Sequence, residues 1–118
     1  MPQARTLAGT GEAHFSGDGG PAPEAGIAEP FGVVKGPDAA IWCCDLGNHR
    51  IRRIGPDGRI ETVVGTGEAG NDGDGGSALD AAITEPYELR FDPAGDLYFV
   101  DMQAHVVRVV HTSDGTIS

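Results

Sequence analysis

Two pairs of aspartate and histidine are the first candidates for chemistry in this sequence of 118 residues. Asp45 precedes His49 by four positions, and Asp101 precedes His105 by the same spacing. A carboxylate beside an imidazole can act as an acid–base pair, or both groups can bind a metal ion. Catalytic residues are needed in one place only, whereas both pairs lie at equivalent positions of a repeat. We therefore interpret them as structural, with each aspartate capping a turn and each histidine bridging strands.

Two glycine-rich segments, residues 14–22 and 70–78, are the next candidates. Asn71, Asp72 and Asp74 in the second segment offer oxygen atoms of the kind that Ca²⁺ binds. The first segment keeps only Asp18, and no glutamate follows at the spacing of a bidentate ligand. Asp-Gly pairs are also ordinary turn chemistry. We expect turns and no cofactor, with a calcium site as the weaker hypothesis.

The charge of the chain argues against two classes of partner. Eight basic and eighteen acidic residues give a formal net charge of −10. This charge repels nucleic-acid backbones and anionic lipid headgroups. Residues 1–20 lack the apolar core of a signal peptide, and no stretch is apolar enough to span a bilayer. We expect neither a nucleic-acid nor a membrane partner, and a cytoplasmic location.

Short strands and tight turns would position the candidate residues. The apolar stretch 41–44 leads into Asp45-Leu46-Gly47-Asn48. In the residues that follow, 49–54, Ile51 and Ile54 alternate imperfectly with arginines. Glycine and asparagine tolerate the positive φ angles of a hairpin, and an aspartate can accept hydrogen bonds from nearby backbone amides. Cys43 and Cys44 would lie on opposite strand faces as small buried residues. The pattern predicts an all-β chain.

The same unit occurs twice, in a register of 56 residues. Between residues 6–54 and 62–110, 19 of 49 positions are identical without a gap, including Arg52 and Arg108. Four strand signals occur in each unit, and those of the first lie at 31–35, 40–44, 49–54 and 60–64. A repeat of this length with four strands predicts β-propeller blades, each a four-stranded antiparallel sheet.

The segment Asn48-His49-Arg50-Ile51 resembles the signature of the NHL repeat, a family of β-propeller blades. The resemblance extends from Thr6 to Ile117, although Gln103-Ala104 replaces Gly-Asn in the second copy. It implies a closed ring of four to eight blades, most commonly six. It also implies that the last blade is completed by a strand from the other terminus.

The repeat divides the chain into three segments. Residues 1–13 form a fourth strand that completes a neighbouring blade. Residues 14–67 form the first blade with its glycine-rich loop, and residues 68–118 form the second, whose fourth strand is incomplete. The residues expected to join chains at this strand are Thr6, Leu7, Ala8, Thr116 and Ile117.

Two blades cannot close a ring, so a single chain would expose an unpaired strand edge and two apolar sheet faces. We expect a homo-oligomer in which residues 6–8 of one copy complete the open blade of the next. A trimer, with six blades, is favoured over a tetramer with eight. The alternative is a piece of a longer propeller, such as a larger bacterial sensor or receptor.

First strands line the central channel of a propeller, and a channel mouth is a common place for a ligand. The candidates for binding at this rim are Phe31, Lys35, Tyr87, Glu88 and Arg90. The sequence therefore predicts a binding or scaffold module, whose further partner is a protein or a small molecule. The alternative is an enzyme similar to the metal-dependent lactonases and lyases of propeller architecture.

Overall fold

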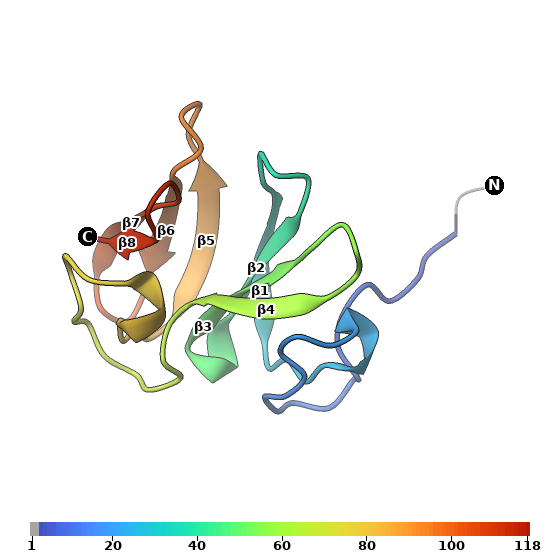
Figure 1. The fold of residues 1–118 in the computed structure, drawn as a ribbon. Coiled ribbons are helices and arrows are strands. Elements are labelled where there is room, and N and C mark those ends of the chain that lie inside the picture. The colour runs from blue at the N-terminus through green and yellow to red at the C-terminus, as the bar shows by residue number, and fades with distance from the viewer. Residues whose placement is uncertain (1–2) are drawn as a thin grey trace.

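The structure is a computed structural model that describes residues 3–118 and contains two four-stranded antiparallel sheets (Figure 1). Sheet 1 consists of β1 (Pro30–Lys35), β2 (Ile41–Asp45), β3 (Arg50–Ile54) and β4 (Ile60–Val64). Sheet 2 consists of β5 (Pro86–Phe91), β6 (Leu97–Asp101), β7 (Val106–His111) and β8 (Thr116–Ile117). The strands follow one another in chain order within each sheet. The predicted all-β class with two such sheets is confirmed.

Three short 3₁₀ turns interrupt the strands, namely η1 (Ala22–Glu24), η2 (Leu46–Asn48) and η3 (Ala78–Asp80). η1 and η3 each begin at the last residue of a glycine-rich segment, and η2 lies in the turn between β2 and β3. Among residues 3–118, no helix is long and apolar enough to cross a membrane.

The two sheets share one hydrogen-bonding register. In sheet 1, Cys44 pairs with Ile51, and in sheet 2 the repeat counterparts Val100 and Val107 pair in the same way. The first strand of each sheet carries a bulge just after its proline, Pro30 or Pro86. The two halves of the chain are therefore copies in backbone structure as well as in sequence.

One face of sheet 1 packs against one face of sheet 2 to form the larger of two apolar clusters. Trp42 from β2 contacts Phe91 from β5 edge to face, with ring centroids 5.0 Å apart. β1 lies alongside β5 (Figure 1), and a Cβ atom on Gly32 would lie 2.8 Å from the carbonyl oxygen of Tyr87. The absence of a side chain at this glycine allows the two first strands to approach closely.

The segment that begins at residue 3 and the C-terminus lie on opposite sides of the molecule (Figure 1). β8 contains only two residues, and the backbone of Ser118 extends its pairing by two reciprocal hydrogen bonds with Val109. The expected strand at Thr6, Leu7 and Ala8 is not a strand in the single chain.

Candidate functional site

A buried arginine ties the glycine-rich segment of each repeat to its sheet. In the first repeat, the side chain of Arg52 on β3 is fully shielded from solvent and donates four hydrogen bonds. Two of them reach carboxylates, Asp45 at 3.0 Å and Asp18 at 2.9 Å. The other two reach the carbonyl oxygens of Gly26 at 2.8 Å and Ser16 at 3.0 Å. Charge-assisted bonds of this kind are the strong ones in a protein interior.

Arg108 on β7 repeats three of these four contacts in the second copy. Its guanidinium donates to the carbonyl oxygens of Ala82 at 3.0 Å and Asp72 at 2.8 Å, and to the Asp74 carboxylate at 2.7 Å. These three acceptors are the repeat counterparts of Gly26, Ser16 and Asp18. The glycine-rich segments are therefore attached to the sheets through one repeated arginine.

This arrangement gives a structural role to most of the residues that the sequence offers for calcium. Asp18 and Asp74 accept hydrogen bonds from arginines, and Asp72 accepts one from the backbone amide of Ala82 at 3.1 Å. Asn71 lies in the same loop with an exposed side chain. In the described part of the chain, no three His, Cys, Asp or Glu residues are grouped closely enough to hold a metal ion.

The sequence led us to expect that the two repeated aspartates cap the turns, but they do not. Asp45 accepts a hydrogen bond from the backbone amide of Ala28 at 2.8 Å. In η2 it accepts one from the side-chain amide of Asn48 at 2.9 Å but makes no capping bond to a backbone amide. Asp101 accepts from the amides of Thr84 at 2.8 Å and Glu85 at 2.9 Å. These acceptors fasten the end of each second strand to the segment that enters the first strand of the same sheet.

The repeated histidines, rather than Gly47 or Asn48, adopt the left-handed backbone conformation, with φ of 55° at His49 and 59° at His105. The expectation that glycine and asparagine take this conformation is wrong. Gly47 is required for space instead, because a Cβ there would lie 2.9 Å from the side chain of Ala28. Gln103 replaces this glycine in sheet 2, yet the left-handed turn is retained.

His49 links the two sheets instead of bridging strands within one blade. Its Nδ1 lies 2.6 Å from the carbonyl oxygen of Thr84, in the segment that leads into β5. This distance identifies Nδ1 as the donor of a hydrogen bond between the repeats. His105 is exposed, and its ring has no hydrogen-bond partner within residues 3–118. The two histidines thus differ because only one of them has a following blade in the chain.

The structure brings part of the predicted channel rim together. The rings of Phe31 and Tyr87 stack with centroids 3.8 Å apart and planes inclined by 33°. Glu88 and Arg90 form an exposed ion pair of 3.1 Å on β5. Lys35 ends β1, whereas Phe31 lies near its beginning. The predicted set is therefore split, with Lys35 away from the aromatic pair.

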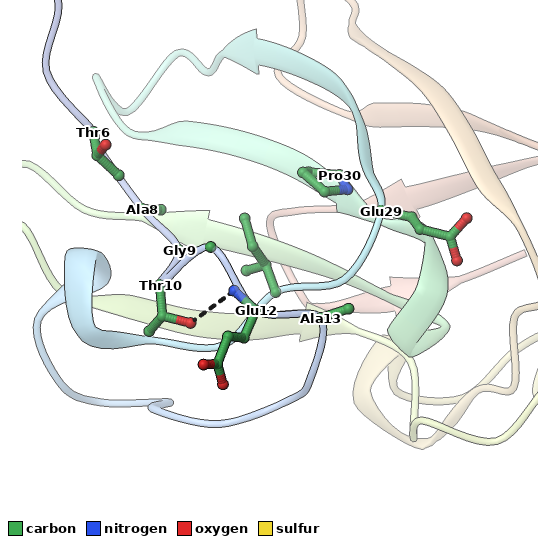
Figure 2. A pocket seen from close by; sticks show the side chains of 10 residues that line it. Thr6, Ala8, Gly9, Thr10, Glu12, Ala13, Glu29 and Pro30 are labelled. Carbon is green, nitrogen blue, oxygen red and sulfur yellow. Dashed lines mark hydrogen bonds between the residues drawn. The ribbon is translucent and has the colours of Figure 1, made fainter.

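A cavity that the sequence did not predict lies between the N-terminal segment and the entrance to β1 (Figure 2). Its volume is about 430 Å³, and its lining includes Gly9, Thr10, Glu12, Ile27 and Glu29. The repeat counterpart of this loop, residues 65–69, lies against the turn that contains His49. The only signal in the sequence is the repeated Gly-Thr-Gly, which is typical of a backbone closely approached by a neighbour.

No family model matches the sequence. Protein SUPPRESSOR OF QUENCHING 1, chloroplastic, from Arabidopsis thaliana is 32% identical over 120 residues, which cover 95% of this chain and 11% of that protein. Teneurin-1 from Homo sapiens is 48% identical over 40 residues, which cover 34% of this chain and 2% of that protein. The chain thus spans about a tenth or less of these relatives.

The fold has a counterpart among solved structures. A crystal structure of a Bacteroides thetaiotaomicron protein described as "Putative phosphatase" matches with a TM-score of 0.70 at 20% sequence identity. The match covers 94% of this chain and 26% of that one. At this level of identity the likeness concerns the fold alone, and it places a two-sheet unit like this one within a chain about four times longer.

Proposed function

We propose that this chain is a two-blade unit of an NHL-type β-propeller that joins head to tail with further copies and serves as a binding scaffold. One observation carries the proposal. Each sheet leaves apolar side chains exposed whose repeat counterparts are buried where the two sheets meet. The single chain therefore presents both halves of an interface that it also forms internally.

The first half is the free face of sheet 2. Trp42, Cys44 and Ile51 on sheet 1 are buried against sheet 2, with exposures of 8%, 0% and 0%. Their counterparts on sheet 2 are Tyr98, Val100 and Val107, with exposures of 42%, 39% and 67%. Apolar side chains that are equivalent to a packed core yet open to water indicate a surface that packs against a partner.

The second half is the free face of sheet 1. Leu89 on β5 is 1% exposed because it packs against sheet 1, whereas its counterpart Val33 on β1 is 65% exposed. Cys43 and Ile54 on this face are already covered by Ala22 and Ala25 of the N-terminal segment. The open part of the face lies around Val33 and is equivalent to the part of sheet 2 that meets sheet 1. A contact between two different surfaces of identical chains is heterologous, and it closes into a ring when the rotation fits.

Strand pairing supports the same arrangement. In sheet 1, Ile51 pairs with Val64 and Arg52 pairs with Thr62. The counterparts on β7, Val107 and Arg108, have no partners on β8, which pairs only with residues 110 and 111. In sheet 1 these partners are Val64 and Thr62. Their repeat counterparts are Ala8 and Thr6, near the N-terminal end of the chain. We propose that these residues of one copy complete sheet 2 of the next.

The N-terminal segment is already held as this pairing requires. The amide of Gly9 donates to the carbonyl oxygen of Ala22 at 3.0 Å. In the second repeat, Gly65 donates to Ala78 at the same distance, and Gly65 directly follows β4. Gly9 is therefore held in the same way as the residue that follows a fourth strand. The residues before Gly9 occupy the place in the chain where that fourth strand would be.

Three copies would give six blades, the number that the NHL resemblance favours. The stacked pair of Phe31 and Tyr87 would then recur around the central channel, with Glu88 and Arg90 beside it. We propose that this aromatic rim binds a protein or a small molecule. The net charge of −10 for each chain disfavours a nucleic acid.

The test uses two variants that each damage one half of the interface. We expect wild-type protein to show an oligomeric mass by light scattering, and Val33→Asp and Val107→Asp each to shift it to the monomer. Because each variant keeps one intact face, an equimolar mixture should form a heterodimer. Leu79→Asp is the control, since Leu79 is an exposed apolar residue (52%) in η3 and outside both faces.

Circular dichroism of every variant would establish that the sheets are retained. The proposal would be contradicted by a wild-type protein that stays monomeric at a protein concentration about 100-fold above a micromolar dissociation constant. So would an oligomer whose mass changes as much with Leu79→Asp as with Val107→Asp. A mixture that remains monomeric would exclude the heterologous contact.

A further inference from the structure

We infer that the cavity beside the N-terminal segment is a seat for one particular element of a neighbouring copy, the turn formed by His105 and Val106. This inference rests on the proposed assembly and specifies the residues of its joint. The seat is defined here as the cavity lined by Thr6, Ala8–Ala13, Ile27, Glu29 and Pro30 (Figure 2).

The second repeat shows how such a seat is filled. A Cβ on Gly65 would lie 2.5 Å from the carbonyl oxygen of His49, and a Cβ on Gly67 would lie 2.5 Å from the guanidinium of Arg50. Arg50 also donates a hydrogen bond to the carbonyl oxygen of Thr66 at 3.0 Å. The turn between β2 and β3 therefore presses directly on the Gly-Thr-Gly segment of the following repeat.

The first repeat has the same segment without that neighbour. A Cβ on Gly11 would meet no atom within 4 Å, and one on Gly9 would meet only the side chain of Ile27, at 3.0 Å. Both glycines nevertheless keep positive φ angles, 98° and 93°, close to the 102° and 96° of their counterparts Gly65 and Gly67. The backbone is thus shaped for a turn that this chain does not itself supply at this position.

The turn at His105 has the shape that the seat requires. Its φ of 59° matches the 55° of His49, and its amide bonds to Met102 as the amide of His49 bonds to Leu46. Its ring is exposed. In the joint, Nδ1 of His105 would donate to the carbonyl oxygen of Ala28, the counterpart of Thr84. That oxygen already accepts from the amide of Gly47 at 2.9 Å and has a second lone pair.

One substitution distinguishes the seat between copies from the filled site within the chain. Val106 stands where Arg50 stands in the first repeat. A valine cannot donate to the carbonyl oxygen of Thr10, as Arg50 does to that of Thr66. We therefore expect an arginine at position 106 to strengthen the joint.

The first experiment adds a methyl group inside the seat. We expect Gly9→Ala to weaken self-association by about tenfold or more, because the added methyl group would meet the carbonyl oxygen of His105 from the neighbour. Gly11→Ala is the control, since Gly11 has nearly the same φ and in the joint would face Val106, which is too short to clash. Because a methyl group on Gly9 also meets Ile27 of its own chain at 3.0 Å, circular dichroism would establish that Gly9→Ala keeps its fold. Sedimentation equilibrium would give both dissociation constants.

The second experiment adds a hydrogen-bond donor to the turn that the seat would hold. We expect Val106→Arg to tighten self-association by about fivefold through one added hydrogen bond from a charged donor. Ser113→Arg is the control, because it adds the same charge in the exposed hairpin between β7 and β8. We expect His105→Ala to weaken association, and His111→Ala, which changes a half-exposed histidine elsewhere on β7, to leave it unchanged.

The outcomes separate this inference from the proposed assembly. Oligomers that respond equally to Gly9→Ala and Gly11→Ala, or that do not tighten with Val106→Arg, would overturn the seat and leave the head-to-tail ring standing. A protein that is monomeric both as wild type and as Val106→Arg would overturn both. Weakening by Gly9→Ala together with tightening by Val106→Arg would support the seat.

Discussion

Arg52 and Asp45 form an ion pair of 3.0 Å in which both side chains are fully shielded from solvent. The pair holds the end of β2 to β3, and the same guanidinium anchors the glycine-rich loop through Asp18. A buried pair of this kind stabilises only when most of its remaining hydrogen-bonding capacity is used. Here the four donors of Nη1 and Nη2 are used, whereas Nε of Arg52 has no partner within residues 3–118.

Replacing this arginine should therefore be costly. We expect Arg52→Met to lower the free energy of unfolding by about 3–5 kcal/mol, because it leaves Asp45 buried and without its charged partner. Urea denaturation followed by circular dichroism would measure the change. Arg53→Met is the matched control, since the ion pairs of Arg53 are partly exposed and should contribute less than about 1 kcal/mol. Equal losses would contradict the assigned role.

The two cysteines should be unreactive in the folded chain. Burial raises the pKa of Cys43 to about 11 and that of Cys44 to about 12. At pH 8 the thiolate fraction is then about 0.1% or less, against roughly a quarter for a free cysteine with a pKa near 8.5. We expect iodoacetamide to modify the folded protein at least about 100-fold more slowly than the protein in urea, as measured by mass spectrometry. Rapid labelling of Cys44 without denaturant would show that the sheets separate readily.

Asp38 should contribute stability that disappears in acid. Burial raises the pKa of Asp38, but hydrogen bonds from Arg53 and Trp42 outweigh this effect and leave the pKa below its ordinary value. Because the folded-state pKa is the lower one, the contribution is complete above the unfolded value of about 3.9 and is lost as the pH falls through the folded value.

The variant Asp38→Asn tests this prediction. We expect it to lower the free energy of unfolding by less than about 1 kcal/mol at pH 7, since both partners are partly exposed. The difference from wild type should shrink between about pH 4 and pH 2. In an Arg53→Met background the same variant should show a weaker pH dependence. A difference that grows in acid would reverse the sign and refute the assignment.

Calcium should have little effect on stability. Asp18 and Asp74 accept hydrogen bonds from Arg52 and Arg108, so a cation in these loops would compete with a guanidinium already in place. We expect the melting temperature to change by less than about 1 °C between millimolar Ca²⁺ and excess chelator, because a ligand stabilises only by its binding to the folded state. A rise of several degrees with Ca²⁺ would restore the calcium hypothesis.

Much of the fold could be predicted from the sequence because its turns are strongly marked. The strand expected at residues 60–64 is β4. The other strands expected in the first repeat begin and end within one residue of β1, β2 and β3. Gly-Pro-Asp-Gly at 55–58 and the repeat of 56 residues fix these limits locally. Local signals of this kind require no knowledge of distant contacts.

The sequence could not predict contacts that depend on distance in space. Asp18 and Arg52 are 34 residues apart, and nothing local distinguishes Asp18 from an ordinary turn aspartate. The left-handed conformation of His49 was equally hidden, because propensity assigns it to Gly47 or Asn48. Gly47 is needed for space against Ala28, and the left-handed φ angle falls on the histidine in both copies, including the second, where Gln103 replaces the glycine.

Trp42 is the single tryptophan of the chain, and its ring lies in the seam between the two sheets, with Nε1 donating to Asp38 at 3.2 Å. Its counterpart at the outer surface is a tyrosine, Tyr98. Trp42 and Tyr98 therefore serve as intrinsic fluorescence probes of two different surfaces. Tryptophan emission should follow the opening of the seam inside one chain, whereas the separation of copies in the proposed assembly should change chiefly the signal of Tyr98.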